Sequence, residues 1–160
     1  MTLPVLINKY EKQLLESQIK TTYTIINQAL GQAIANGIEY DSFDTKNRND
    51  QTIKEWYNLV FKPYLKISKL CLNVKPTGCW HQIYTIKNAT TGGANSISND
   101  EVQFILTNGA SFTIKNYSAE WIDYVYGVKT KNSSSVLFFD ANGKKQPNKL
   151  GIDVHILVWS

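Results

Sequence analysis

One stretch, Thr2 to Asn36, constrains the fold of this 160-residue chain more than any other part of the sequence. At the 3.6-residue period of an α-helix its apolar side chains fall on or beside one stripe, and Lys, Gln, Glu and Asn side chains occupy the opposite face. Pro4 is compatible with a helix start, because the first N–H groups of a helix have no partner within it. Gly37 can adopt the left-handed conformation that ends a helix. We therefore predict a helix over about residues 4–36, roughly 50 Å in length.

A second apolar pattern at helical spacing follows a polar loop and covers about residues 51–70. Asn49 or Asp50 can cap its first turn. Pro63 lies inside the pattern and is expected to kink or split this second helix. Its aromatic side chains are expected to lie in the core rather than in a ligand cage. The apolar face consists of Ile53, Trp56, Tyr57, Val60, Phe61, Tyr64, Leu65 and Ile67.

From Cys79 onward the apolar side chains alternate with polar ones, which is typical of β-strands. The clearest signal is a hairpin, in which Val102–Leu106 and Phe112–Ile114 flank an Asn108-Gly109 turn. A strand or a short irregular element is predicted at Trp121–Val128. Further strands are predicted at Trp80–Thr85, Ser135–Phe139 and Ile152–Trp159.

Helices that precede strands in this way predict a single α+β domain, residues 1–160. Residues 1–36 contain the long helix and residues 37–78 contain the second helix with its loops. Residues 79–160 form an antiparallel sheet of about four to six strands, on which both helices pack.

The composition argues against several classes of function. The net charge is only +4, the lysines are dispersed along the chain and Arg48 is the one arginine, so nucleic acid is not an expected partner. No nucleophile–base pair and no pair of carboxylates occurs at an informative spacing, so we expect neither an enzyme nor a small-molecule substrate. The sequence contains no run of 18 apolar residues that would form a transmembrane helix.

Cys71 and Cys79 are separated by seven residues that include Pro76 and Gly78, so a short loop can fold back and close a disulfide. A disulfide implies an oxidising compartment. Zinc is a poor alternative, because it needs four ligands and only His81 is near. A catalytic Cys–His pair has no flanking signature in its favour. We predict the disulfide.

Four stretches, in order along the chain, carry a resemblance to a known family. TLPVLINKYEKQLLESQIKTTYTIINQAL is similar to a helix that leaves the membrane at an LPxLI sequence and continues as a Lys- and Gln-rich amphipathic helix. The Tyr64-Leu65-Lys66 segment before Cys71, the hairpin VQFILTNGASFTI and the closing FFDANGKKQPNKLGIDVHILVW also fit. Over nearly its whole length the chain resembles prepilin-type proteins, which comprise type IV pilins and the pseudopilins of type II secretion systems.

The resemblance implies a structural subunit of a bacterial type IV pilus or type II secretion pseudopilus, with other subunits of the same or different kinds as its partners. It also implies that the full-length form is anchored in the inner membrane with the domain outside the cytoplasm. From there the subunit would enter an extracellular filament or a periplasmic pseudopilus. The leader-peptidase site, the membrane half of the helix and the family's acidic residue near its start are absent from this sequence, so the chain is not expected to form filaments unaided.

For the long helix, the resemblance implies two roles at its two ends. The N-terminal residues are expected to protrude for subunit assembly, and the alternative is that they fold back onto the same domain. The protruding set is Leu3, Leu6, Ile7 and Tyr10. The sheet-facing set is expected to be Leu14, Ile19, Tyr23, Ile26, Leu30 and Ile34.

Some pseudopilins hold calcium in their closing loop, so the corresponding loop here is a candidate metal site. Asp140, Asn142 and Asp153 are the expected ligands, because carboxylate and amide oxygens around a Gly turn can wrap a hard cation. The alternative is an Asx-type turn, in which the side chains bond to nearby backbone. Lys144, Lys145 and the presence of only two acids favour the turn, so no cofactor is expected.

A second hypothesis for function is a minor pilin or adhesin-type binding module that recognises a surface ligand or DNA. Exposed aromatic side chains beside lysines in the Thr90–Asn99 or Asn116–Ser134 loops would favour this hypothesis.

Overall fold

The computed structural model describes residues 2–38, 50–72, 78–79, 85–88, 94–96, 102–129 and 134–158. Within these ranges the fold is α+β, as predicted. The helical elements are α1 (Leu3–Ala35), α2 (Asp50–Trp56), the π-helical turn η2 (Tyr57–Phe61) and α3 (Ala119–Tyr126). The strands are β1 (Ile67–Leu72), β2 (Thr85–Asn88), β3 (Ala94–Ser96), β4 (Val102–Leu106), β5 (Ser111–Tyr117), β6 (Ser134–Asp140), β7 (Lys149–Leu150) and β8 (Val154–Val158).

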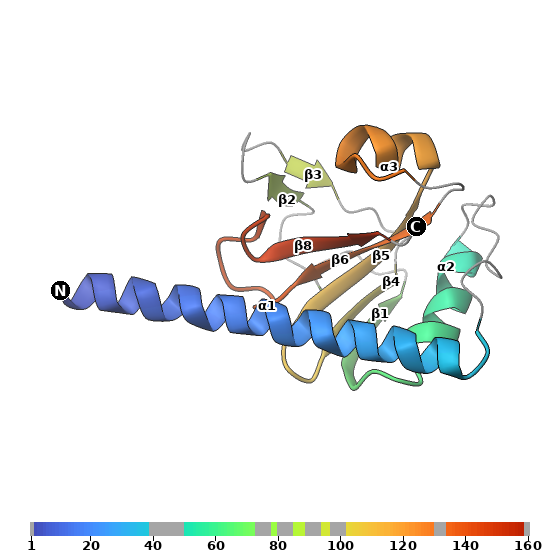
Figure 1. Ribbon diagram of the computed structural model, residues 1–160, viewed down its shortest axis with the longest axis horizontal. Coiled ribbons are helices and arrows are strands. Elements are labelled where there is room, and N and C mark those ends of the chain that lie inside the picture. Colours follow the sequence, from blue (N-terminus) through green and yellow to red (C-terminus); the bar gives the residue numbers. More distant parts are fainter. Residues whose placement is uncertain are drawn as a thin grey trace.

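The described strands form one eight-stranded sheet in the order β1-β4-β5-β6-β8-β7-β2-β3 (Figure 1). Neighbouring strands are antiparallel except for β2 with β7 and β7 with β8, which are parallel. The sheet is therefore larger than predicted and mostly, not wholly, antiparallel. It also includes β1, which lies before residue 79, where the sheet was expected to begin.

The predicted hairpin is confirmed as β4 and β5. Phe104 lies opposite Phe112, and Gly109 in the connecting turn has a φ of 91°. Such a positive φ costs little for glycine, because it has no Cβ to clash with the backbone. The predicted strand at Trp80–Thr85 lies outside the described residues except for Thr85, which begins β2.

Helix α1 ends where the sequence predicts. Gly37 has a φ of 85° and its N–H donates to the carbonyl of Ile34 at 2.9 Å, while the N–H of Ile38 donates to the carbonyl of Ala33 at 3.1 Å. These are the two bonds of a Schellman motif, which satisfies carbonyls that otherwise lack partners at a helix end. Ile38 then packs against the main core, so the motif directs the chain back onto the domain.

The C-terminal half of α1 lies along one face of the sheet, and its N-terminal half extends beyond the sheet (Figure 1). The predicted sheet-facing set is partly wrong. Ile26 and Leu30 are buried and Ile19 packs partly against the core. The other three members are exposed: Leu14, Tyr23 and Ile34.

Small side chains are buried on α1 where these larger ones were expected. Thr22, Ala29 and Ala33 are buried, although none of them was predicted to face the sheet. Small residues allow a helix to approach its neighbour closely, and the close neighbour of α1 is η2, so hydrophobicity alone does not identify the buried face. The large apolar side chains of Leu14, Tyr23 and Ile34 therefore lie outside the buried face of the helix.

The second helix is shorter than predicted. Helix α2 passes into η2, which ends at Phe61, and Pro63 lies in the following turn. The N–H of Lys62 donates to the carbonyl of Tyr57, the i to i−5 bond of a π-helix. Proline has no N–H to continue the helix, and the residues predicted to form its last turns pair with β4 as strand β1 instead.

The main core lies between α1, η2 and one face of the sheet. Phe112 stacks on Phe104 at 5.0 Å and on Phe139 at 5.9 Å between ring centroids. Tyr57 and Phe61 of η2 pack on Phe104 at 5.3 and 6.1 Å. The aromatic residues of the second helix therefore belong to the core, as predicted. Burial raises the pKa of the Tyr57 phenol, because desolvation disfavours its charged form.

Helix α3 covers the other face of the sheet, on the opposite side from α1 (Figure 1). Ile122 is fully buried there and packs with a second core cluster that includes Val136, Phe138 and Val154. The prediction of a strand or irregular element was wrong. The Ser118 hydroxyl accepts the N–H of Trp121 at 3.3 Å as an N-cap, and Gly127, with a φ of 66°, ends the helix.

The closing loop, residues 141–153, packs directly on the turn between β4 and β5. A Cβ atom at Gly143 would lie 2.6 Å from the carbonyl oxygen of Gly109, and Gly143 also has a φ of 69°. Only glycine tolerates both the positive φ and the short contact, so Gly143 allows the closing loop to pack this closely on the hairpin.

We predict that Gly143→Ala lowers the free energy of unfolding by about 2 to 4 kcal/mol, because alanine must adopt a left-handed backbone and its Cβ overlaps the Gly109 backbone. Gly151→Ala is the matched control, because Gly151 has a φ of 80° but open space around it. It should cost about 1 to 2 kcal/mol. Chemical denaturation measures both values, and equal losses would contradict the close contact.

Candidate functional site

The N-terminal segment of α1, Leu3–Leu14, is an exposed surface that the core does not explain. Every residue in it is exposed, and its large apolar side chains are between 45% and 71% exposed. Leu15 is the first residue of the helix that packs against the main core. Leu3, Leu6, Ile7 and Tyr10 therefore protrude and do not fold back onto the domain.

The apolar residues of this segment form a stripe with its own direction. Successive residues of an α-helix are about 100° apart around the axis, so the five members of the stripe lie within an arc of roughly 100°. The centre of this arc is about 130° from the centre of the arc that holds the buried residues of α1. The stripe is thus a separate surface and not an extension of the core face. We call it the N-terminal stripe; it consists of Leu3, Leu6, Ile7, Tyr10 and Leu14.

The spacing of the N-terminal stripe suits contact with another helix. Leu3, Ile7, Tyr10 and Leu14 follow the four-three-four spacing of a heptad, by which helices pack along a seam. The charged residues of the segment lie outside the arc of the stripe. Farther along the same side of α1 the exposed residues include Ser17, Thr21, Gln28 and Gln32, which are polar but uncharged.

The predicted metal ligands come together in the structure, but their hydrogen bonds serve the closing loop itself. Asp140 and Asp153 are fully buried. The Asp153 carboxylate accepts the N–H groups of Asn148 at 2.8 Å and Lys149 at 2.7 Å. Asp140 Oδ1 accepts the N–H of Asn142 at 3.1 Å, which is the geometry of an Asx turn.

These contacts do not fit a calcium ion. Calcium takes about six to eight oxygen ligands, whereas N–H donors already occupy both carboxylate oxygens of Asp153. Asn142 directs its Nδ2 towards Asp153 Oδ2 at 3.5 Å, so it presents a donor and not an oxygen. In the part of the chain that the structure describes, no group of three or more His, Cys, Asp or Glu side chains could hold a metal ion. The geometry favours the Asx-turn alternative.

The predicted disulfide is present. Cys71 on β1 is bonded to Cys79, with their Cα atoms 6.1 Å apart, and both residues are buried. The backbone at Gly78 lies close against the bond, because a Cβ there would be 2.9 Å from the Cys71 sulfur. Lys69 Nζ also donates to the Gly78 carbonyl at 3.0 Å. The two cysteines are therefore structural and supply neither a catalytic thiol nor a zinc ligand.

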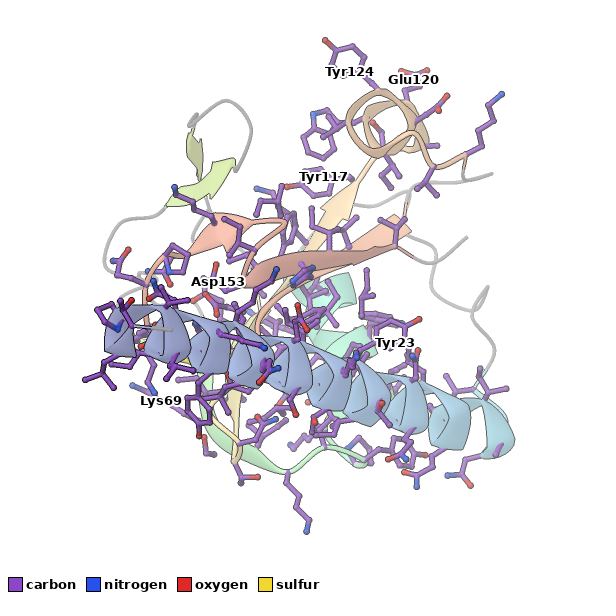
Figure 2. The ribbon with its side chains drawn as sticks, turned by 60° about the vertical axis from the view of Figure 1, so that its left-hand side comes forward. Tyr23, Lys69, Tyr117, Glu120, Tyr124 and Asp153 are labelled. Carbon is purple, nitrogen blue, oxygen red and sulfur yellow. A yellow bond between two sulfur atoms is a disulfide. The ribbon has the colours of Figure 1, made fainter. Side chains whose placement is uncertain are left out.

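A second exposed surface lies on the outer side of α3. Trp121 is 38% exposed and Tyr124 is 89% exposed. Figure 2 shows Tyr124 and Glu120 projecting from α3 away from the sheet. These residues lie within the Asn116–Ser134 stretch, where exposed aromatic residues would favour a binding module, but the helix face itself was not predicted. The sequence pattern that indicates this helix face is the spacing of Trp121, Tyr124 and Val125, which places the three side chains on one side of a helix.

The chain thus forms an α+β domain from which the amphipathic N-terminal half of α1 projects. Residues 5–151 match a family model described as a family of unknown function, DUF6613, and the chain belongs to that family. Comparison with curated proteins gives no match, and comparison with solved structures gives none either. Among the residues described, no helix is both long enough and apolar enough to cross a membrane.

We predict that the double variant Cys71→Ala/Cys79→Ala loses about 2 to 3 kcal/mol of unfolding free energy, because an unlinked chain gains entropy when it unfolds. Chemical denaturation with and without dithiothreitol provides the measurement. The reductant should lower the stability of the wild type to that of the variant and leave the variant unchanged. If the reductant also lowered the unfolding free energy of the variant, it would be acting on something other than this disulfide.

We also predict that Asp153→Asn lowers the unfolding free energy by about 1 to 3 kcal/mol, because an amide cannot accept both backbone N–H groups as the carboxylate does. The exposed Asp123→Asn is the control and should change stability by less than about 0.5 kcal/mol. Adding calcium in place of a chelator should leave the wild-type Tm unchanged. A rise in Tm that Asp153→Asn abolishes would contradict the Asx-turn interpretation, because a bound ligand stabilises the folded state.

Proposed function

We propose that this protein is a structural subunit that assembles through the N-terminal segment of α1, in the manner of a type IV pilin or a type II secretion pseudopilin. The observation that supports this most strongly is the N-terminal stripe, five apolar side chains on a projecting helix that point away from the core face. Each apolar side chain that becomes buried contributes about 1.5 to 3 kcal/mol, so contacts of this kind sum to a stable polymer over many subunits.

The partners of the N-terminal stripe in this proposal are helices of neighbouring subunits. In such a filament α1 would lie at the centre, and the rest of the α+β domain would form the outer layer. In the full-length protein a membrane-spanning stretch would precede Thr2 and anchor the subunit in the inner membrane before assembly. The coding sequence upstream of Thr2 should then encode a basic leader and about 20 apolar residues; an unrelated domain there would argue against the proposal.

The proposed role is structural and not catalytic. The buried acids of the closing loop bond to its own backbone, the cysteines are joined in a disulfide, and the buried Tyr57 phenol is part of the core. All of these groups serve the fold itself, so the proposal includes no cofactor and no small-molecule substrate.

We predict that Ile7→Glu removes the protein from high-mass assemblies in the cells that produce it, because a buried carboxylate opposes helix packing. Val5→Glu is the matched control. Val5 and Ile7 are 51% and 47% exposed, but Val5 lies about 160° from the centre of the stripe. Sedimentation of sheared surface material, followed by immunoblotting, measures the assembled fraction. Both purified variants should keep the wild-type Tm.

Single cysteines provide an independent measurement, because Cys71 and Cys79 are already bonded to each other. In assembled material Ile7→Cys should react more slowly with a maleimide reagent than Val5→Cys, because subunit contacts bury residue 7. Equal labelling of the two variants, or full assembly of Ile7→Glu, would contradict assembly through this stripe.

A further inference from the structure

Exposed and stacked aromatic side chains lie on and beside α3. We call Trp121, Tyr124 and the Tyr117 ring that supports Trp121 the aromatic platform. The Trp121 and Tyr117 rings are stacked, with centroids 3.9 Å apart and an angle of 9° between planes. Tyr117 in turn contacts two residues of the sheet: its ring meets Phe138 edge-on at 6.3 Å, and Lys115 Nζ lies 5.4 Å from its centroid. The indole is thus fixed by a ring that is anchored on the sheet, so little side-chain freedom remains to be lost when a ligand binds.

Polar groups border this platform. Glu120 on the same helix is exposed and projects near Tyr124 (Figure 2), and its carboxylate accepts hydrogen bonds. Tyr124, one turn along from Trp121, offers both an exposed ring and a hydroxyl that can donate or accept. The surface therefore combines flat apolar area with hydrogen-bond acceptors at its edges.

We propose that this face of α3 binds a neutral glycan, with a sugar ring lying on Trp121 and Tyr124. A pyranose ring has the complementary chemistry: one face is made of C–H groups, which pack on an aromatic ring, and its rim carries hydroxyls, which donate to carboxylates. The platform lies on the side of the sheet opposite α1 (Figure 1), so binding there does not depend on assembly through the N-terminal stripe.

Other occupants match the surface less well. A protein partner would need roughly 800 Å² on each side of a standard interface, whereas Trp121, Tyr124 and Val125 expose on the order of 300 to 400 Å². A nucleic-acid strand needs a positively charged groove, but the exposed Glu120 would repel its phosphates. The same carboxylate would be repelled by an anionic lipid surface.

Titration of the isotope-labelled protein with cellohexaose, chitohexaose and maltohexaose, followed by NMR, tests this inference. At least one of the three should shift the Trp121 indole signal and bind with a Kd on the order of 1 mM or tighter. Tyr124→Ala should weaken that binding at least about tenfold, because it removes an exposed ring that makes few contacts with the rest of the fold. Trp121→Ala should do the same, and Trp121→Phe should retain part of the affinity.

Tyr23→Ala is the matched control, because Tyr23 is also an exposed tyrosine but lies on α1; it should leave binding unchanged. Oligo-dT and vesicles of phosphatidylglycerol are added in parallel. The inference is overturned if none of the three sugars shifts the Trp121 signal, if Tyr124→Ala binds as well as the wild type, or if oligo-dT or the vesicles perturb these residues in place of the sugars.

Discussion

The packing of the C-terminal half of α1 on the row of Phe104, Phe112 and Phe139 is the contact on which the rest of the structure depends. It places the helix along the sheet, and the buried side chains of Ala29 and Ala33 are small enough for the helix to lie close to η2. The position of α1 on the sheet sets the direction in which its free half projects. The Schellman motif at Gly37 completes the arrangement, since it turns the chain so that Ile38 joins the same core.

Features set by local chemistry could be read from the sequence. Gly37, the Asn108-Gly109 turn and the Cys71–Cys79 pair were all predicted, because each depends on backbone preferences or on a short distance along the chain. The protrusion of the first residues of α1 was expected from the resemblance to prepilin-type proteins more than from the pattern. The exposed fraction of the side chains then distinguished it from the folded-back alternative.

Features set by tertiary contact could not be read in this way. The segment after Pro63 has apolar residues that also fit a helix, and pairing with β4 decides that it is β1. The side of α1 that meets the sheet is chosen by Ala29 and Ala33, whose hydrophobicity is low, so the larger Tyr23 and Ile34 suggested the wrong face. In α3 the capping residues Ser118 and Gly127 outweigh the strand propensity of the residues between them.

In the part of the chain that the structure describes, residues 3–14 of α1 are exposed and belong to neither core cluster, yet they are helical. As a separate peptide, a segment of this length would be largely unfolded in water, because the first helical turn is costly to form. Here the packed turns that follow Leu14 supply that nucleus, and the helix continues outward from them by adding one hydrogen bond per residue. Any molecule that meets the segment therefore encounters a rod that is already formed. Most of the entropy of ordering the segment is lost before contact, and the rate of association is limited by diffusion and orientation rather than by folding.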